Sequence, residues 1–75
     1  MNIKTLAAGV RHLQNDEAFC YIIESIKKDQ ANIFFNPYSS AEEREESHTI
    51  IRALSKIESR LAQVLADEAI FDKKQ

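Results

Sequence analysis

The stretch from Ser40 to Phe71 reads SAEEREESHTIIRALSKIESRLAQVLADEAIF and contains neither Gly nor Pro. Apolar residues recur in it at alternating spacings of four and three, namely Ile50, Leu54, Ile57, Leu61 and Val64. This spacing places them on one face of an α-helix, as in the seam of a coiled coil. An isolated helix is only marginally stable in water, so most of the stability of this helix must come from burying its apolar face. The rest of the chain therefore has to supply a partner.

Two shorter amphipathic segments precede this stretch. In the first, apolar residues step by three, four and three: Ile3, Leu6, Val10 and Leu13. They predict a short helix at about residues 3–13. A second apolar stripe, which begins at Phe19, predicts a helix at about 16–34. Asn15 and Asp16 are both suitable N-cap residues for this second helix.

Residues 36–40 form the one strong break in the helical pattern. Pro37 has no backbone N–H and disfavours helical geometry in the residue before it. Ser40 followed by Glu43 is typical of a capping box, and the same motif is also possible one residue earlier. Either register predicts that the long helix begins here and extends over about 40–71.

The lengths of the predicted helices indicate how they pack. At about 1.5 Å per residue, helix 16–34 is about 28 Å long and helix 40–71 about 48 Å. The five-residue connection predicts an antiparallel hairpin. Helix 3–13 would then cover the overhanging end of the long helix, roughly in line with the middle helix and with a bend at Asn15. We therefore expect an all-α fold in which residues 1–75 form a single small helical domain.

Two layers of helix leave apolar side chains uncovered. Three adjacent pairs present apolar groups in two directions: Ile22 and Ile23, Ile50 and Ile51, and Val64 and Leu65. Aromatic residues also cluster at the loop, where they could close the end of the hairpin or dock on another protein. We expect a protein-binding surface that serves a homo-oligomer or a larger protein. Its candidate residues are Phe34, Phe35, Tyr38, Ile51, Leu65 and Phe71.

The charge distribution argues against nucleic acid as the main partner. The net charge is −2, so the chain lacks the basic footprint that nucleic-acid binding needs. Arg52, Lys56 and Arg60 lie along one helical ridge, for which we favour a solvated face over a contact with DNA. No apolar run approaches 18 residues, and the N-terminal segment does not have the pattern of a signal peptide, so we expect no membrane association.

Residues that could carry metal or catalytic chemistry are few and poorly spaced. His12 and His48 are the only histidines and Cys20 is the only cysteine, which rules out an internal disulfide and fits a reducing compartment. Glu45 and His48 stand three apart but lack the second such pair of a carboxylate metal site. The single Gly9 cannot form a phosphate-binding loop. We therefore expect no metal, no cofactor and no enzymatic activity.

The order of these features resembles a group of small helical proteins encoded by tailed bacteriophages and prophages, near their portal, terminase and head genes. The matching segments are Leu13 to Phe19, Phe34 or Phe35, Ser39-Ser40, Arg44 to His48, Ala53 to Ile57, Leu61, and Asp67-Glu68. The chain departs from the pattern where other members carry Trp, and where a Gly often follows the final acid.

The resemblance implies a phage origin and a role near the head or packaging machinery. We expect a structural, assembly or packaging accessory that binds protein, in the host cytoplasm or in the virion. Two other hypotheses stay open. One is an inhibitor of a host enzyme or defence complex, whose acidic cluster at 42–46 would mimic a phosphate backbone. The other is a small DNA-packaging subunit that contacts nucleic acid through Arg52, Lys56 and Arg60.

Overall fold

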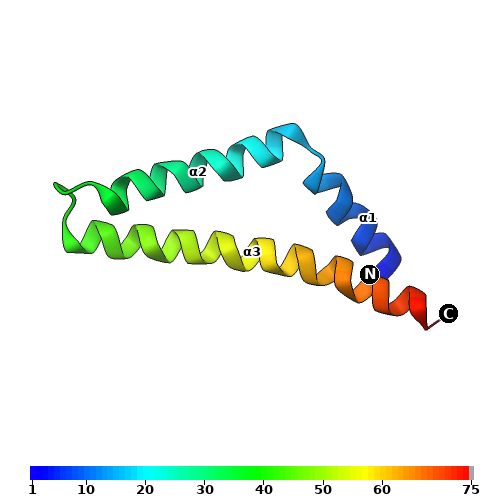
Figure 1. Ribbon diagram of the computed structural model, residues 1–75. Coiled ribbons are helices and arrows are strands. Elements are labelled where there is room, and N and C mark those ends of the chain that lie inside the picture. The colour runs from blue at the N-terminus through cyan, green and yellow to red at the C-terminus, as the bar shows by residue number, and fades with distance from the viewer. Residues whose placement is uncertain (75) are drawn as a thin grey trace.

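The computed structural model describes residues 1–74, which form three α-helices (Figure 1). They are α1 (Ile3–Gln14), α2 (Glu17–Phe35) and α3 (Ala41–Lys73). The prediction of an all-α hairpin with a short N-terminal helix on the long helix is confirmed. Each predicted boundary lies within two residues of the observed one.

Each helix begins at a residue whose side chain accepts a backbone hydrogen bond. The backbone N–H of Thr5 donates to Oδ1 of Asn2, and that of Phe19 donates to Oδ1 of Asp16, both over 2.8 Å. At the start of α3 the Ser40–Glu43 capping box is complete, because each residue's side chain accepts from the other's backbone N–H. These caps satisfy N–H groups that have no partner within their helix.

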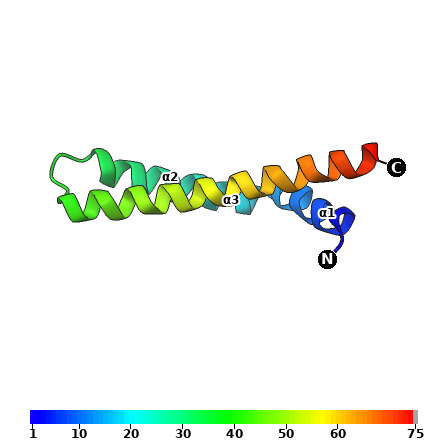
Figure 2. The same ribbon diagram turned by 90° about the horizontal axis from the view of Figure 1, so that it is seen from below.

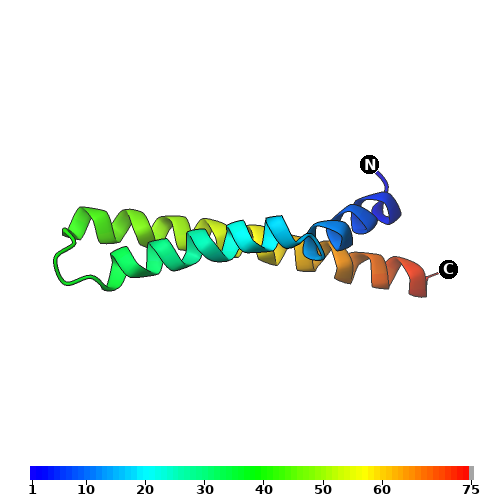
Figure 3. The same cartoon turned by 90° about the horizontal axis from the view of Figure 1, so that it is seen from above.

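The three helices form a narrow triangle. α2 and α3 lie side by side next to the loop and diverge toward the other end, where α1 turns back onto α3 (Figures 1–3). The predicted bend at Asn15 is confirmed, but it is sharper than the roughly in-line course expected (Figure 1). Asp16 adopts an extended conformation between the two helices, and one such residue is enough to redirect the chain.

The buried core is small for a chain of this length. Four hydrophobic residues are buried: Ala7, Val10, Leu54 and Val64. Three of them form a cluster between α1 and α3, with Ile3, Leu61 and Leu65 packed around it. α2 contributes no fully buried residue. The Cα trace measures 55 × 22 × 17 Å, so the molecule is an elongated slab that is only slightly wider than it is thick. We call the two sides that lie on either side of the plane of the three helices its broad sides.

Candidate protein-binding face

Glu68 holds α1 against the end of α3. It is almost completely buried, yet it is a charged residue, and two cations of α1 surround it. Arg11 donates from both terminal guanidinium nitrogens to its carboxylate, and Lys4 Nζ lies 3.0 Å from its Oε2. Lys4 also contacts Asp72 at 3.0 Å. A buried carboxylate with two cationic partners is stabilised in its charged form.

The pKa values of this cluster follow from its hydrogen bonds. The bonds from Arg11 and Lys4 lower the pKa of Glu68 from 4.5 to about 2. In turn, the hydrogen bond to Glu68 raises the pKa of Lys4, and the same is true of Arg11. All three groups therefore stay charged throughout the neutral range, and the cluster forms a permanent electrostatic link between α1 and α3.

A second ion pair joins α2 to α3. Lys27 Nζ lies 2.7 Å from Oε1 of Glu58 and 3.4 Å from Oε1 of Glu24 on its own helix. Glu24 thus pairs with Lys27, three residues along α2, and not with Lys28. The i,i+3 partner is preferred because Lys27 points toward α3, where Glu58 fixes its position. The hydrogen bond to Glu58 raises the pKa of Lys27.

These ion pairs mark one broad side of the slab, the ion-paired side. On α1, Ala7 and Val10 face α3, while Lys4 and Arg11 stand seven residues apart on one flank of that contact. At about 100° per residue, Leu6 and Leu13 occupy the other flank. The same geometry places Lys27 on one flank of α2, as its contact with Glu58 requires.

The other broad side carries partly exposed aliphatic and aromatic groups, and we name it the apolar face. On α3, residues at steps of seven lie in one strip, so Ile57 and Phe71 flank the buried Val64. On α2, Ile22 lies on the flank away from Lys27. The exposed fractions are 38% for Leu6, 39% for Leu13, 54% for Ile22, 49% for Ile57 and 38% for Phe71. These five residues define the apolar face.

Of two shallow hollows on this side, the one between α1 and α3 supports the assignment. One has a volume of about 510 Å³, and Leu6, Leu13 and Leu61 line it together, so α1 and α3 contribute to the same side. The other has a volume of about 180 Å³ near the loop, where Ile33 of α2 and Ile50 of α3 line it together with four polar residues: Gln30, Glu43, Glu46 and Ser47. The apolar character of this side is therefore clearest between α1 and α3 and decreases toward the loop.

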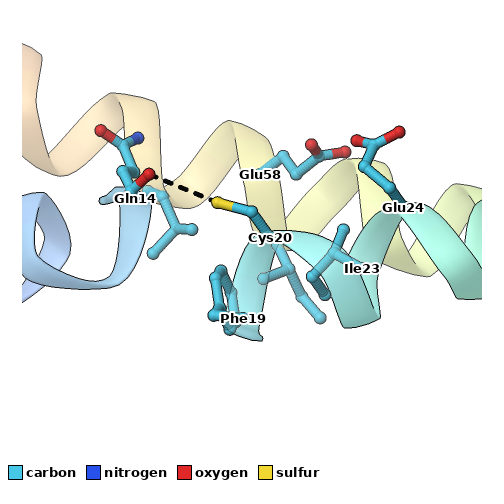
Figure 4. Close-up of a pocket in the computed structure, with 8 residues that line it drawn as sticks. Gln14, Phe19, Cys20, Ile23, Glu24 and Glu58 are labelled. Atoms are coloured by element: carbon cyan, nitrogen blue, oxygen red, sulfur yellow. Dashed lines mark hydrogen bonds between the residues drawn. The ribbon is translucent and has the colours of Figure 1, made fainter. Parts of the chain in front are cut away.

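A small cavity opens where α2 and α3 diverge (Figure 4). Its volume is about 150 Å³, and apolar groups line much of it: Phe19, Ile23, Ile57 and Leu61. Cys20 lies at its edge, where its Sγ donates to the carbonyl oxygen of Gln14 over 3.3 Å (Figure 4). The thiol thus fastens α2 to the end of α1, which gives this cysteine a structural contact.

The aromatic residues at the loop do not act as one unit. Phe34 is half-buried and meets Phe35 edge to face, with ring centroids 5.2 Å apart. Its ring also lies 6.0 Å from that of His48. Phe35 and Tyr38 are 78% and 94% exposed. Of the three aromatic residues, only Phe34 packs at the end of the hairpin. Phe35 and Tyr38 stay exposed and remain available to a partner.

The remaining predicted site residues divide between the interior and the surface. Ile51 is half-buried, and Leu65 packs against the α1–α3 cluster. Their side chains thus contribute to packing within the chain. Phe71 lies on the apolar face and stays a candidate for binding.

Sequence reasoning missed two features of this region. It did not assign Leu6, Leu13 or Ile57 to a binding surface, because all three belong to stripes that were expected to be covered. It also missed Glu68, although a signal exists: Leu54, Leu61 and Glu68 follow steps of seven. A carboxylate in the place of the third leucine predicts a cationic partner.

The charged clusters singled out in the sequence lie at the surface. Arg52, Lys56 and Arg60 are exposed along α3, as are the acidic residues at the start of that helix. Glu43 is used by the capping box, and its bonds with Ser40 lower its pKa. The inhibitor and DNA-packaging hypotheses stay predictions.

No family model, no curated protein and no solved structure matches this chain. No helix within residues 1–74 is long and apolar enough to cross a membrane. The same residues contain no group of three or more His, Cys, Asp or Glu side chains placed to hold a metal ion.

Proposed function

We propose that this chain is a structural, assembly or packaging accessory protein of a tailed bacteriophage. It acts by binding protein, through self-association or by docking on head or portal proteins. The phage setting rests on the sequence resemblance described above. The mode of action rests on one observation, which is the apolar face that α1, α2 and α3 present together.

The contrast between the two broad sides supports a binding role. On one side Lys4, Arg11 and Lys27 each reach a carboxylate of α3, so charge is neutralised within the chain. Among residues 1–74, every ion pair between helices belongs to the ion-paired side, whereas the aliphatic groups of the other side are partly exposed. Contiguous apolar surface on a small protein marks a contact site, since exposure to water is unfavourable.

The experiment combines virion composition with direct binding. Mass spectrometry of purified virions from a phage that encodes the chain tests whether it is a structural component. Copurification with that phage's portal and major head proteins tests docking. We expect Ile22→Glu to weaken docking at least tenfold, because it places a charge on the apolar face.

Tyr21→Glu is the matched control, since Tyr21 is the adjacent residue of α2, is 76% exposed and points away from α3. It should bind like the unmodified chain. A chain that is absent from virions, binds neither head nor portal protein and stays monomeric at high concentration would contradict the proposal.

A further inference from the structure

We infer that the protein partner of this chain presents a short acidic helix, which a row of cations on the outer side of α3 binds. The row consists of Arg52, Lys56 and Arg60, and we name it the cationic ridge. This inference rests on the proposed function and deepens it, because it states the chemistry of the protein surface that the accessory protein binds.

The cationic ridge has no counterion within the chain. Its three residues are exposed, and none of them forms an ion pair with any other of residues 1–74. No carboxylate stands three or four residues from any of them, where side chains on a helix are neighbours. By contrast, Lys4, Arg11 and Lys27 each reach a carboxylate of α3. The ridge therefore carries positive charge that another molecule can neutralise.

A shallow hollow lies on the ridge between two of its cations. It has a volume of about 270 Å³, and Thr49, Arg52, Ala53 and Lys56 line it. Thr49 and Ala53 are small beside the two long cationic side chains, so the surface is lower between them. Helices pack by placing side chains of one helix into such grooves of the other. The hollow therefore lets a partner helix approach α3 closely while its carboxylates meet the cations.

The length of the ridge fits a short acidic segment. Arg52 and Arg60 are eight residues apart, which is about 12 Å along the helix. Glu45 lies seven residues before the ridge and Asp67 seven residues after it, so an exposed carboxylate follows about two turns beyond each end. Duplex DNA lying along α3 would meet both carboxylates. A helix with acidic residues four apart matches the ridge alone, because its carboxylates recur at the same interval of about 6 Å.

The ridge also borders the apolar face. Arg60 stands three residues after Ile57, so the two side chains are neighbours on the surface of α3. Protein interfaces combine an apolar centre with a polar rim. A partner that covers Ile57 would bring the margin of its surface to Arg60, where acidic residues give favourable contacts.

Fluorescence anisotropy tests the inference with a labelled, stapled helical peptide that carries three glutamates at steps of four residues. The comparison peptide has glutamine at the same three positions. The unmodified chain should bind the glutamate peptide at low salt, at least tenfold more tightly than the glutamine peptide. Added salt should weaken this binding, because it screens exposed charges.

Two variants that each lose three positive charges locate the binding site. The ridge variant combines Arg52→Gln, Lys56→Gln and Arg60→Gln. The matched control changes three exposed lysines elsewhere, by Lys28→Gln, Lys73→Gln and Lys74→Gln. The ridge variant should bind the glutamate peptide at least tenfold more weakly with its helical circular dichroism retained, whereas the control should bind like the unmodified chain. No binding at low salt, an equal loss in both variants, or tighter binding of duplex DNA than of the peptide would overturn the inference.

A charge exchange provides a second measurement in which a loss of folding cannot imitate the expected result. Lys56→Glu should weaken binding of the glutamate peptide. A peptide whose central glutamate is replaced by lysine should bind Lys56→Glu more tightly than it binds the unmodified chain. Absence of this rescue would also overturn the inference.

The two proposals fail in different ways. A chain that binds the glutamate peptide through the ridge, but is absent from virions and binds no head or portal protein, would remove the accessory role and leave the ridge intact. A chain that docks on head or portal protein through Ile22, with the same affinity in the ridge variant, would remove the acidic partner helix and leave the accessory role intact.

Discussion

Arg11 on α1 donates hydrogen bonds to both carboxylate oxygens of Glu68 on α3, across 57 residues of sequence. Lys4, two turns earlier on α1, contacts the same carboxylate. α1 has only 12 residues and is too short to be stable alone in water. The hydrogen bonds to Glu68 therefore help to keep α1 helical and packed against the end of α3.

The first prediction concerns the exchange of α1 amides. Glu68→Gln removes the negative charge that Lys4 and Arg11 share, so α1 should open more often. Hydrogen–deuterium exchange measured by mass spectrometry should become faster in 3–14 and stay unchanged at the loop end of α3. Asp67→Asn is the control, because the neighbouring Asp67 is exposed and contacts only its own helix in the described structure. Unchanged exchange in α1 of the Gln variant would show that the apolar cluster alone holds this helix.

The second prediction is a loss of stability in acid. The pKa of Glu68 falls from 4.5 to about 2 on folding, so the folded state binds fewer protons than the unfolded state between these values. Its contribution is complete above pH 4.5 and is lost as the pH falls toward 2. Urea unfolding at a series of pH values should show this decline in the free energy of unfolding. In Glu68→Gln the decline should be shallower, and identical slopes in the two proteins would be evidence against a depressed pKa.

The third prediction tests the start of the long helix. Ser40→Ala removes the side chain that accepts from the Glu43 N–H, which should lower the free energy of unfolding by about 1 kcal/mol. Ser39→Ala is the matched control and should have little effect, because the box forms in the Ser40 register. Urea denaturation followed by circular dichroism measures both. A larger loss from Ser39→Ala would assign the cap to the earlier register.

Much of this fold could be predicted because its signals are local. The caps at Asp16 and Ser40 depend on residues within one turn, and the apolar stripes depend on spacing alone. The helix lengths predicted that the long helix overhangs the middle helix and that the N-terminal helix covers the overhanging end. The contact between Lys4 and Asp72 shows that α1 lies at this end of α3. Local rules suffice for these features, since each involves the backbone of a single helix or its length.

The binding face could not be predicted in the same way. Ile57 belongs to the stripe of the long helix, and its spacing predicted burial. It is half-exposed because it lines the cavity that opens between α2 and α3. Leu65 was expected at the surface, yet the return of α1 covers it. The exposure of Ile57 and the burial of Leu65 both depend on the angles between helices. The spacing of apolar residues along one helix does not predict these angles.

The fourth prediction compares two adjacent alanines of α1. Ala7 is fully buried against α3, whereas Ala8 is exposed. Ala7→Leu would force α1 away from Val64, which should cost about 1–3 kcal/mol in the free energy of unfolding. Ala8→Leu should change it by less than about 0.5 kcal/mol. Thermal and urea unfolding of the two variants provide the measurement, and equal effects would mean that α1 does not pack on α3 through Ala7.

The last prediction is a stabilising change at Gly9. This residue lies within α1 and has no positive φ, so its backbone does not require glycine. A Cβ atom built there meets nothing within 4 Å. Because glycine in a helix interior is about 1 kcal/mol less favourable than alanine, Gly9→Ala should raise the free energy of unfolding by roughly this amount.

Urea unfolding followed by circular dichroism measures this gain in dilute solution. Destabilisation in dilute solution would contradict the helical conformation of α1 at Gly9.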